Sequence, residues 1–291
     1  MFVESIVRWI LLSLVWLCRF WTRLTYRIKR VFHPPKVTAE KKSVFDLAKP
    51  ISHHSVFIFR DFHDEEELTA GAAKCTWLAV LSGTKCVTLH DVEGVLKDNF
   101  VAFVYKLCSP GVANKLYREC CGVCGQEHCE ETLEFVIRCL DTDETRKLRY
   151  TLETDANRKI FVRSVETCSD SSESVSENAV RIHVSCAESG RQGMAQLARE
   201  IVENKEKLST DDITEEFVSA NLCANRDLES AERDPELGIL FGDSLLLPSL
   251  LPWHTSFTEF VPTQTTLRSF GWADYLDILG AYTKRNKRFG K

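Results

Sequence analysis

Apolar residues along the chain fall into two patterns, short continuous runs and longer segments with helical spacing. Four short runs bounded by turn or charged residues predict buried strands, at 54–59, 85–90, 181–186 and 237–241. Between them, helical spacing predicts helices over residues 64–81, 97–108, 191–203 and 209–222. Strands that alternate with helices favour right-handed crossovers and parallel pairing. The pattern therefore predicts an α/β domain with a mostly parallel central sheet flanked by helices.

The last sixty residues have their own pattern. The run 237–241 ends at Gly242, a second apolar stretch ends in Pro252-Trp253-His254, and helical spacing returns from Trp272 to Tyr282. The chain then ends in a cationic segment, residues 284–291. On charge alone, such a tail is a solvated chain end.

The first residues predict a membrane anchor. Trp9 to Cys18 carries no charge, and the apolar stretch reaches about seventeen residues if Glu4 and Arg8 are tolerated, against about 20 for a full span. A short transmembrane helix and an interfacial amphipathic helix both fit. A cleaved signal peptide fits less well, because no small-x-small site follows. Basic residues after the apolar run predict a cytosolic body.

These features divide the chain. We expect an anchor and basic neck at 1–33, a linker at 34–50 that begins with Pro34-Pro35, and a globular domain at 51–291. Residues 19–42 carry a net +7 within a chain of net charge −5, so the rest is near −12. An acidic body argues against nucleic acid as a partner. A basic neck suits the anionic lipid of a membrane surface.

Cysteine usage indicates a reducing compartment. The chain has twelve cysteines and no Asn-x-Ser/Thr sequon. Six cysteines lie in apolar surroundings typical of buried thiols, namely Cys75, Cys86, Cys108, Cys139, Cys186 and Cys223. We therefore expect the body to face the cytosol.

A variable insert at 109–178 interrupts the α/β pattern. Within it, Cys121, Cys124, His128 and Cys129 have ligand types and spacings that zinc could use. Four ligands so close in sequence would need help from Cys108 or Cys139, and thiols in a variable loop are the alternative. The acidic, Ser-rich stretch 165–177 is typical of a disordered loop.

Several motifs resemble the cis-prenyltransferase family, and in particular its non-catalytic eukaryotic branch, a subunit of dehydrodolichyl diphosphate synthase. The matching residues are Asp234-Pro235-Glu236-Leu237, Phe241-Gly242, Leu251-Pro252-Trp253-His254, Thr258-Glu259 and the closing Arg288-Phe289-Gly290-Lys291. An Arg-x-Gly at the end of the chain is typical of family members that complete a prenyltransferase active site. Gly190-Arg191 is similar to the family's Gly-Gly-Arg turn.

Other positions depart from the catalytic members of that family. The first strand resembles theirs at His54, Phe57 and Ile58, but Arg60 stands where they have the aspartate that supports magnesium and the allylic diphosphate. The family's two diphosphate-binding arginines correspond to Leu240 and Leu246, and leucine cannot donate to phosphate. The resemblance therefore implies a retained scaffold and tail without a diphosphate site of its own.

The resemblance implies a required but non-catalytic subunit of ditrans,polycis-polyprenyl diphosphate synthase. A catalytic cis-prenyltransferase would be the partner, with Mg²⁺ held mainly by that partner and with farnesyl and isopentenyl diphosphate as substrates. Arg288 and Gly290 would bind isopentenyl diphosphate in trans, supported by Glu259 and Phe289. The implied location is the endoplasmic reticulum membrane, and the product serves dolichol synthesis and protein glycosylation. The alternative is a membrane-anchored receptor or lipid-binding scaffold without catalytic contribution.

Overall fold

A computed structural model describes most of the globular domain. The described residues are 54–60, 62, 64–109, 111–116, 132–142, 144–154, 160–168, 179–203, 209–222, 234–242, 255, 258–263 and 265–284. All of them belong to one unit of the chain, Ala39–Lys291. The expected anchor, the four zinc candidates and the C-terminal Arg288-Phe289-Gly290 lie outside the described residues. Among the described helices, none is long and apolar enough to cross a membrane.

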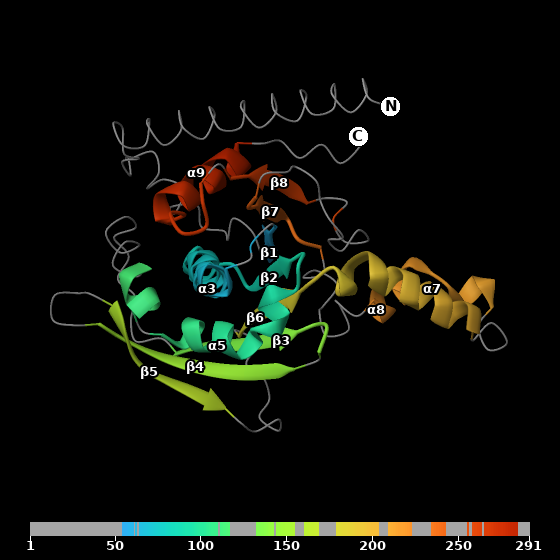
Figure 1. Cartoon of the computed structure of the whole chain (residues 1–291), viewed down its shortest axis with the longest axis horizontal. Coiled ribbons are helices and arrows are strands. Elements are labelled where there is room, and N and C mark those ends of the chain that lie inside the picture. Colours follow the sequence, from blue (N-terminus) through green and yellow to red (C-terminus); the bar gives the residue numbers. More distant parts are fainter. Residues whose placement is uncertain are drawn as a thin grey trace, which may run out of the picture. The chain divides into compact units, whose positions relative to one another are not determined.

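One eight-stranded sheet organises this unit (Figure 1), in the order β5-β4-β3-β6-β2-β1-β7-β8. The six strands from β3 to β8 in that order pair in parallel, and β4 and β5 extend the sheet with antiparallel pairing. The predicted α/β class with a mostly parallel sheet is confirmed. The strands are β1 His54–Phe59, β2 Cys86–Asp91, β3 Thr132–Cys139, β4 Thr145–Thr154, β5 Ile160–Cys168, β6 Val180–Ser185, β7 Leu237–Leu240 and β8 Glu259–Pro262.

The predicted helices are present, but two of them are divided. The described α-helices include α3 Glu65–Leu81, α4 Val95–Asp98, α5 Phe100–Cys108, α7 Gly193–Glu203, α8 Glu215–Asn221 and α9 Trp272–Thr283, and residues 111–116 are also helical. The helix expected over 97–108 is interrupted at Asn99, between α4 and α5. The helix expected over 209–222 is wrong as a single element. Ser209 caps only a short 3₁₀ turn, Thr210–Asp212, and Thr214 caps the separate helix α8. Two N-capping side chains so close together begin two elements rather than one.

The insert is more ordered than its composition predicts. Residues 132–168 form β3, β4 and β5, which lie at one end of the sheet. The disordered loop predicted for 165–177 is therefore wrong for its first four residues, which belong to β5. The alternation in Phe135–Cys139 buries every second residue, and it was a strand signal within the insert.

The two faces of the sheet differ in chemistry. On one face, α3 and α5 lie side by side (Figure 1) over an apolar core. There Trp77 of α3 packs against Phe135 and Tyr150, with ring centroids 5.2 and 5.0 Å apart. The Trp77–Tyr150 pair is edge-to-face and the Trp77–Phe135 pair is tilted, and such aromatic contacts add to the stabilisation from burial. This face is therefore filled by aromatic side chains.

The opposite face carries buried polar pairs. His54 Nε2 lies 2.8 Å from Thr88 Oγ1, and His90 Nδ1 lies 3.0 Å from Ser185 Oγ. His183 is buried beside Cys86, and burial together with the charges of nearby basic groups lowers its pKa to about 3. These pairs satisfy polar groups that burial would otherwise destabilise.

Five cysteines whose side chains the structure describes are thiols, four of them buried and Cys108 half-buried. This confirms the expectation of buried thiols for Cys75, Cys86, Cys139 and Cys186, whereas Cys108 is only partly buried. Cys223 lies outside the described residues.

Candidate functional site: the carboxyl edge of the parallel sheet

In open α/β sheets, ligands bind beyond the carboxyl ends of the parallel strands. In this chain that edge is formed by the residues that follow β1, β2, β6, β3 and β7. They include Arg60 after β1, Asp91 at the end of β2, Cys186 after β6 and Asp141 after β3. Parallel pairing brings these ends to the same side of the sheet.

Arg60 lies beside Gly242, which follows β7. The Phe241 amide donates to the Ile58 carbonyl oxygen at 2.8 Å, so the two strand ends remain paired. Gly242 has a φ of +119°, and a Cβ there would lie 2.9 Å from the Arg60 carbonyl oxygen. Only glycine suits that position. Arg60, which stands where the resemblance places an aspartate, therefore lies against the end of β7.

Leu240 is buried and apolar. It is 4% exposed and packs with Val56 and Ile58 on the face of the sheet opposite α3. Its side chain has no donor for a phosphate oxygen. Leu246, the second position of this kind, lies outside the described residues.

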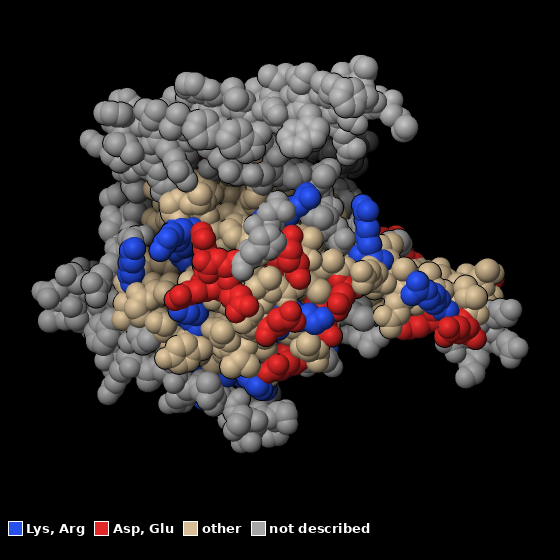
Figure 2. Space-filling model, in the orientation of Figure 1, with Lys and Arg blue, Asp and Glu red and all other residues tan. Residues whose placement is uncertain are grey.

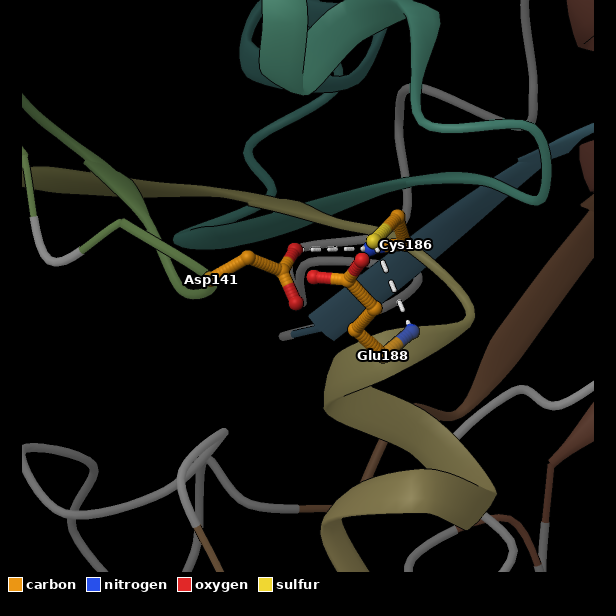
Figure 3. A group of neighbouring side chains, drawn as sticks. All are labelled: Asp141, Cys186 and Glu188. Carbon is orange, nitrogen blue, oxygen red and sulfur yellow. Dashed lines mark hydrogen bonds between the residues drawn. The ribbon is translucent and has the colours of Figure 1, made fainter.

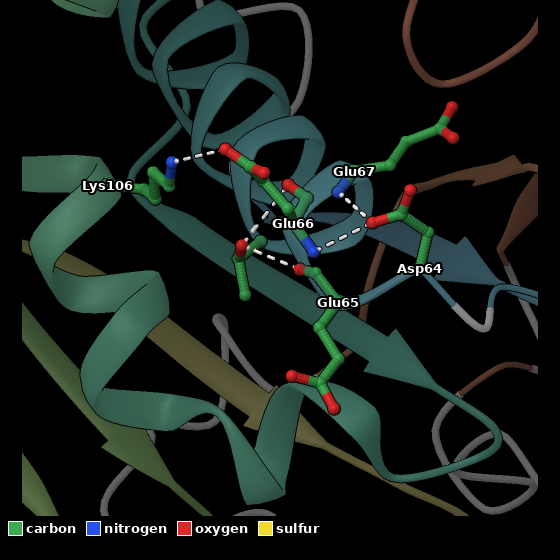
Figure 4. Close-up of polar contacts among 6 residues, drawn as sticks. Asp64, Glu65, Glu66, Glu67 and Lys106 are labelled. Atoms are coloured by element: carbon green, nitrogen blue, oxygen red, sulfur yellow. Dashed lines mark hydrogen bonds and ion pairs between the residues drawn. The ribbon is translucent and has the colours of Figure 1, made fainter.

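The N-terminus of α3 already holds a carboxylate (Figure 4). The Asp64 side chain accepts hydrogen bonds from the Glu66 and Glu67 amides, both at 3.0 Å. Free amides at a helix N-terminus are a common phosphate site. Here the chain supplies its own anion to these two amides, and three glutamates follow it in the first turn. A diphosphate would meet like charge at this position.

Asp91 serves the backbone rather than a ligand. Its carboxylate accepts from the Leu96 amide at 2.8 Å and from the Glu93 amide at 3.3 Å, which fixes the turn before α4. Burial raises the pKa of Asp91 to about 6, although these hydrogen bonds oppose the shift. The charge of Glu93 raises the pKa further.

Asp141, Cys186 and Glu188 bring three metal-binding atoms within 4.8 Å of one another (Figure 3). The short distances between these atoms suit a small ion, but the bonds that the three residues already make do not leave them available to one. Glu188 is paired with Lys97, and the Cys186 amide donates to Asp141 at 3.0 Å. Burial raises the pKa of the Cys186 thiol to about 12. Magnesium prefers a set of oxygen ligands, so a protonated thiol and a lysine-paired glutamate do not fit it.

Carboxylates outnumber cations around this edge, as the acidic side chains in Figure 2 illustrate. The residues that follow the strand ends supply Asp64, Glu65, Glu66, Glu67, Glu93, Asp98, Asp141 and Glu188. The described cations in the same segments are Arg60, Lys97 and Arg191, and Lys106 of α5 lies against Glu66. Lys97 and Lys106 are paired with Glu188 and Glu66. The negative potential of these carboxylates disfavours the binding of a diphosphate at this edge.

Two of the resembling motifs lie against each other. The Thr258 hydroxyl donates to the Pro235 carbonyl oxygen at 2.6 Å, and the Glu259 amide donates to the Glu236 carbonyl oxygen at 3.0 Å. The Thr-Glu pair therefore begins β8 beside the Asp-Pro-Glu segment that leads into β7. Glu259 is half-buried. Gly190 is buried in the π-helical turn Glu188–Gln192, and Arg191 beside it is exposed.

Comparisons with known proteins identify the family. The profile of the family described as "putative undecaprenyl diphosphate synthase" matches residues 130–290, more than half of the chain. The chain therefore belongs to this prenyltransferase family. The matched region begins beside β3 and includes the C-terminal Arg-x-Gly.

Individual relatives match over shorter stretches. An isoprenyl transferase of Streptococcus pyogenes serotype M6 is 36% identical over 85 residues, which cover 29% of this chain and 34% of the relative. One from Streptococcus agalactiae serotype V is 33% identical over 103 residues, 35% of this chain and 41% of the relative. The chain thus matches only about a third to two fifths of the length of these relatives.

Among solved structures, similar chains include lavandulyl diphosphate synthase from Lavandula x intermedia, at 19% identity and a TM-score of 0.48. That match covers 83% of this chain and 99% of the other. A probable undecaprenyl diphosphate synthase from Campylobacter jejuni has 15% identity and a TM-score of 0.44, with coverages of 82% and 99%.

Proposed function

We propose that this chain is the non-catalytic but required subunit of a cis-prenyltransferase complex. It would belong to the branch that includes the Nogo-B receptor subunit of dehydrodolichyl diphosphate synthase. A catalytic cis-prenyltransferase would be its partner, and long-chain polyprenyl diphosphate for dolichol synthesis would be the product. The observation that carries the proposal is the contrast between a family profile that extends into the C-terminal tail and an acidic strand edge with Arg60 in the aspartate position.

The edge of the chain's own sheet supports a non-catalytic role. A diphosphate needs donors and a counter-ion. At this edge Leu240 is buried and apolar, and two α3 amides are bonded to Asp64. Because Arg60 stands in the family's aspartate position, we assign the magnesium and the allylic diphosphate to the partner.

The tail supplies the chemistry that this edge lacks. The Arg288 guanidinium offers a planar pair of donors that matches a phosphate oxygen pair. Gly290 has no side chain, so its amide can approach a phosphate oxygen closely. Phe289 would pack between them, and Glu259 lies earlier in the same C-terminal region. In this proposal the tail binds isopentenyl diphosphate in the partner's active site.

A surface for the partner is available on α7. Of its eleven residues only Leu197 is buried, while Ala198 and Val202 are exposed, Val202 by 66%. An amphipathic helix with exposed apolar side chains is typical of an interface. We assign this side of α7 to the contact with the catalytic subunit.

We place the complex at the endoplasmic reticulum membrane with the globular domain in the cytosol. The basic neck and the uncharged stretch Trp9–Cys18 support the anchor. The described thiols, and a sequence without glycosylation sequons, support a reducing compartment.

Reconstitution tests the proposal. The chain and the catalytic cis-prenyltransferase of the same organism are purified separately and together, then supplied with farnesyl diphosphate, isopentenyl diphosphate and Mg²⁺. We expect elongation by the pair and none by this chain alone. If the partner reaches full activity alone, this chain is a receptor or scaffold and the subunit role is wrong.

A further inference from the structure

Lys74 ties α3 to the segment that precedes α9. Its Nζ donates to the carbonyl oxygens of Leu267 and Arg268, both at 3.0 Å. A protonated amine that donates to two consecutive carbonyls fixes the backbone at two adjacent points, and such charge-assisted hydrogen bonds are stronger than neutral ones. These two hydrogen bonds serve neither the carboxyl edge of the sheet nor, directly, the residues of the tail.

The same segment is held by packing. Leu267 is fully buried, and its side chain lies in the space that Gly71 of α3 leaves by having no Cβ. The Phe270 amide donates to the Thr266 carbonyl oxygen at 2.9 Å, which closes the turn around Leu267. Lys74, through its hydrogen bonds, and Leu267, through its packing against Gly71, thus join the turn before α9 to α3.

This joint continues directly into α9. Asp274 accepts from the Gly271 amide at 3.0 Å and from the Thr265 hydroxyl at 3.1 Å, so the first turn of α9 is tied to the same segment. The Tyr275 hydroxyl lies 3.1 Å from Ser82 Oγ, just after the end of α3. The direction of α9 is therefore set by its contacts with α3.

The direction of α9 determines where the tail starts. The helix has twelve residues, a length of about 18 Å. A tilt of about 10° at its start would displace its end by about 3 Å over that length. Arg288 is only four residues beyond Lys284, the last described residue. Misplacement of a catalytic group by about 1 Å can cost up to about 10²-fold in rate.

We propose that Lys74 is a positioning residue for the tail. By holding the start of α9 against α3, it sets the point from which Arg288 and Gly290 reach the partner's isopentenyl diphosphate. This inference rests on the proposed function. It assigns a role in substrate binding to a lysine on α3 that is itself remote in sequence from the tail.

The test compares Lys74→Met, Lys74→Arg and the control Lys106→Met in the reconstituted complex. Lys106 also contacts α3, but it donates to Glu66 at 3.2 Å rather than to the segment before α9. We expect Lys74→Met to raise the KM for isopentenyl diphosphate by about tenfold while the KM for farnesyl diphosphate and the binding of the partner stay unchanged. Lys74→Arg, which can donate to both carbonyls, should restore the KM.

A second measurement needs neither partner nor substrate. Hydrogen exchange on the full chain should show faster exchange of the amides in residues 269–284 in Lys74→Met, with α5 and β6 unchanged. If exchange in that segment and the KM both stay at wild-type values, the inference is wrong. Equal rises of both KM values, or loss of partner binding, would also overturn it, because they indicate general structural damage.

The variant Arg288→Ala distinguishes a failure of the positioning role of Lys74 from a failure of the proposed function. A large loss of turnover in Arg288→Ala with normal behaviour of Lys74→Met sinks only the positioning role. No effect of Arg288→Ala contradicts the proposed function itself.

Discussion

The side chain of Leu267 lies directly against the backbone of Gly71. A Cβ on Gly71 would overlap three carbon atoms of Leu267, which is fully buried and has little room to move. The contact joins the middle of α3 to the turn before α9, two segments almost two hundred residues apart in sequence. The C-terminal part of the domain therefore depends on a glycine far from it.

Gly71→Ala should destabilise the domain by about 1–3 kcal/mol, the usual cost of overpacking a core. Gly280→Ala is the control, because a Cβ there meets nothing within 4 Å and alanine favours a helix. Urea unfolding of the residue 43–291 fragment measures both. Adding Leu267→Ala should remove part of the Gly71→Ala penalty, and strict additivity of the two changes would contradict the overlap.

Asp91 should make a pH-dependent contribution to stability. Its folded-state pKa of about 6 lies above the ordinary value, so the folded protein holds this proton more tightly than the unfolded chain. The contribution is complete below about pH 4 and is lost as the pH rises from about 4 to about 6. Asp91→Asn keeps one oxygen acceptor and does not titrate.

The free energy of unfolding of Asp91→Asn should therefore rise relative to wild type by about 1–3 kcal/mol between about pH 4 and about pH 7. Denaturant unfolding at several pH values gives this difference. Asp98→Asn, at an exposed residue of α4, is the matched control for the loss of a carboxylate from the same region. A constant difference between wild type and Asp91→Asn across this range would show that burial does not control the carboxyl group.

Restoring the family's aspartate should not restore activity. Arg60→Asp still leaves Leu240 buried and the α3 amides bonded to Asp64. We expect no incorporation of isopentenyl diphosphate by the partner-free variant, as for the wild-type chain. Prenyl elongation by either protein, in preparations proven free of the partner, would show that the acidic edge does bind diphosphate.

The anchor should affect location more than chemistry. Deletion of residues 1–42 removes the apolar stretch and the basic neck. The truncated chain should move from the membrane to the soluble fraction and still bind its partner. Fractionation followed by co-purification measures both, and failure to bind the partner would reveal a role of the neck in assembly.

The sequence predicted four of the six parallel strands, β1, β2, β6 and β7, because they are short apolar runs between clear turn signals. It missed β3, β4 and β5, because the clustered cysteines and serines of the insert are typical of loops, although Leu148, Tyr150 and Leu152 of β4 alternate with polar residues. It also missed β8, whose four residues were recognised only as the Thr-Glu motif.

The candidate site was predictable only in part. Arg60 and Leu240 could be identified from the resemblance, because strand position alone places them at the sheet. The roles of Asp64 and Asp91 could not, because a carboxylate that caps amides looks in sequence like one that binds metal. No sequence pattern indicated the role of Lys74, because its partners are backbone carbonyls almost two hundred residues away.

Turnover of the reconstituted complex carrying Arg288→Ala tests the central claim most directly. The control is Arg285→Ala, which removes a neighbouring tail charge outside the Arg-x-Gly motif. We predict that Arg288→Ala lowers turnover by on the order of 10²–10³, that a bulky residue at Gly290 does the same, and that partner binding in a pull-down is unchanged. Near-normal turnover of Arg288→Ala, or loss of the partner in the pull-down, would contradict the in-trans role of the tail.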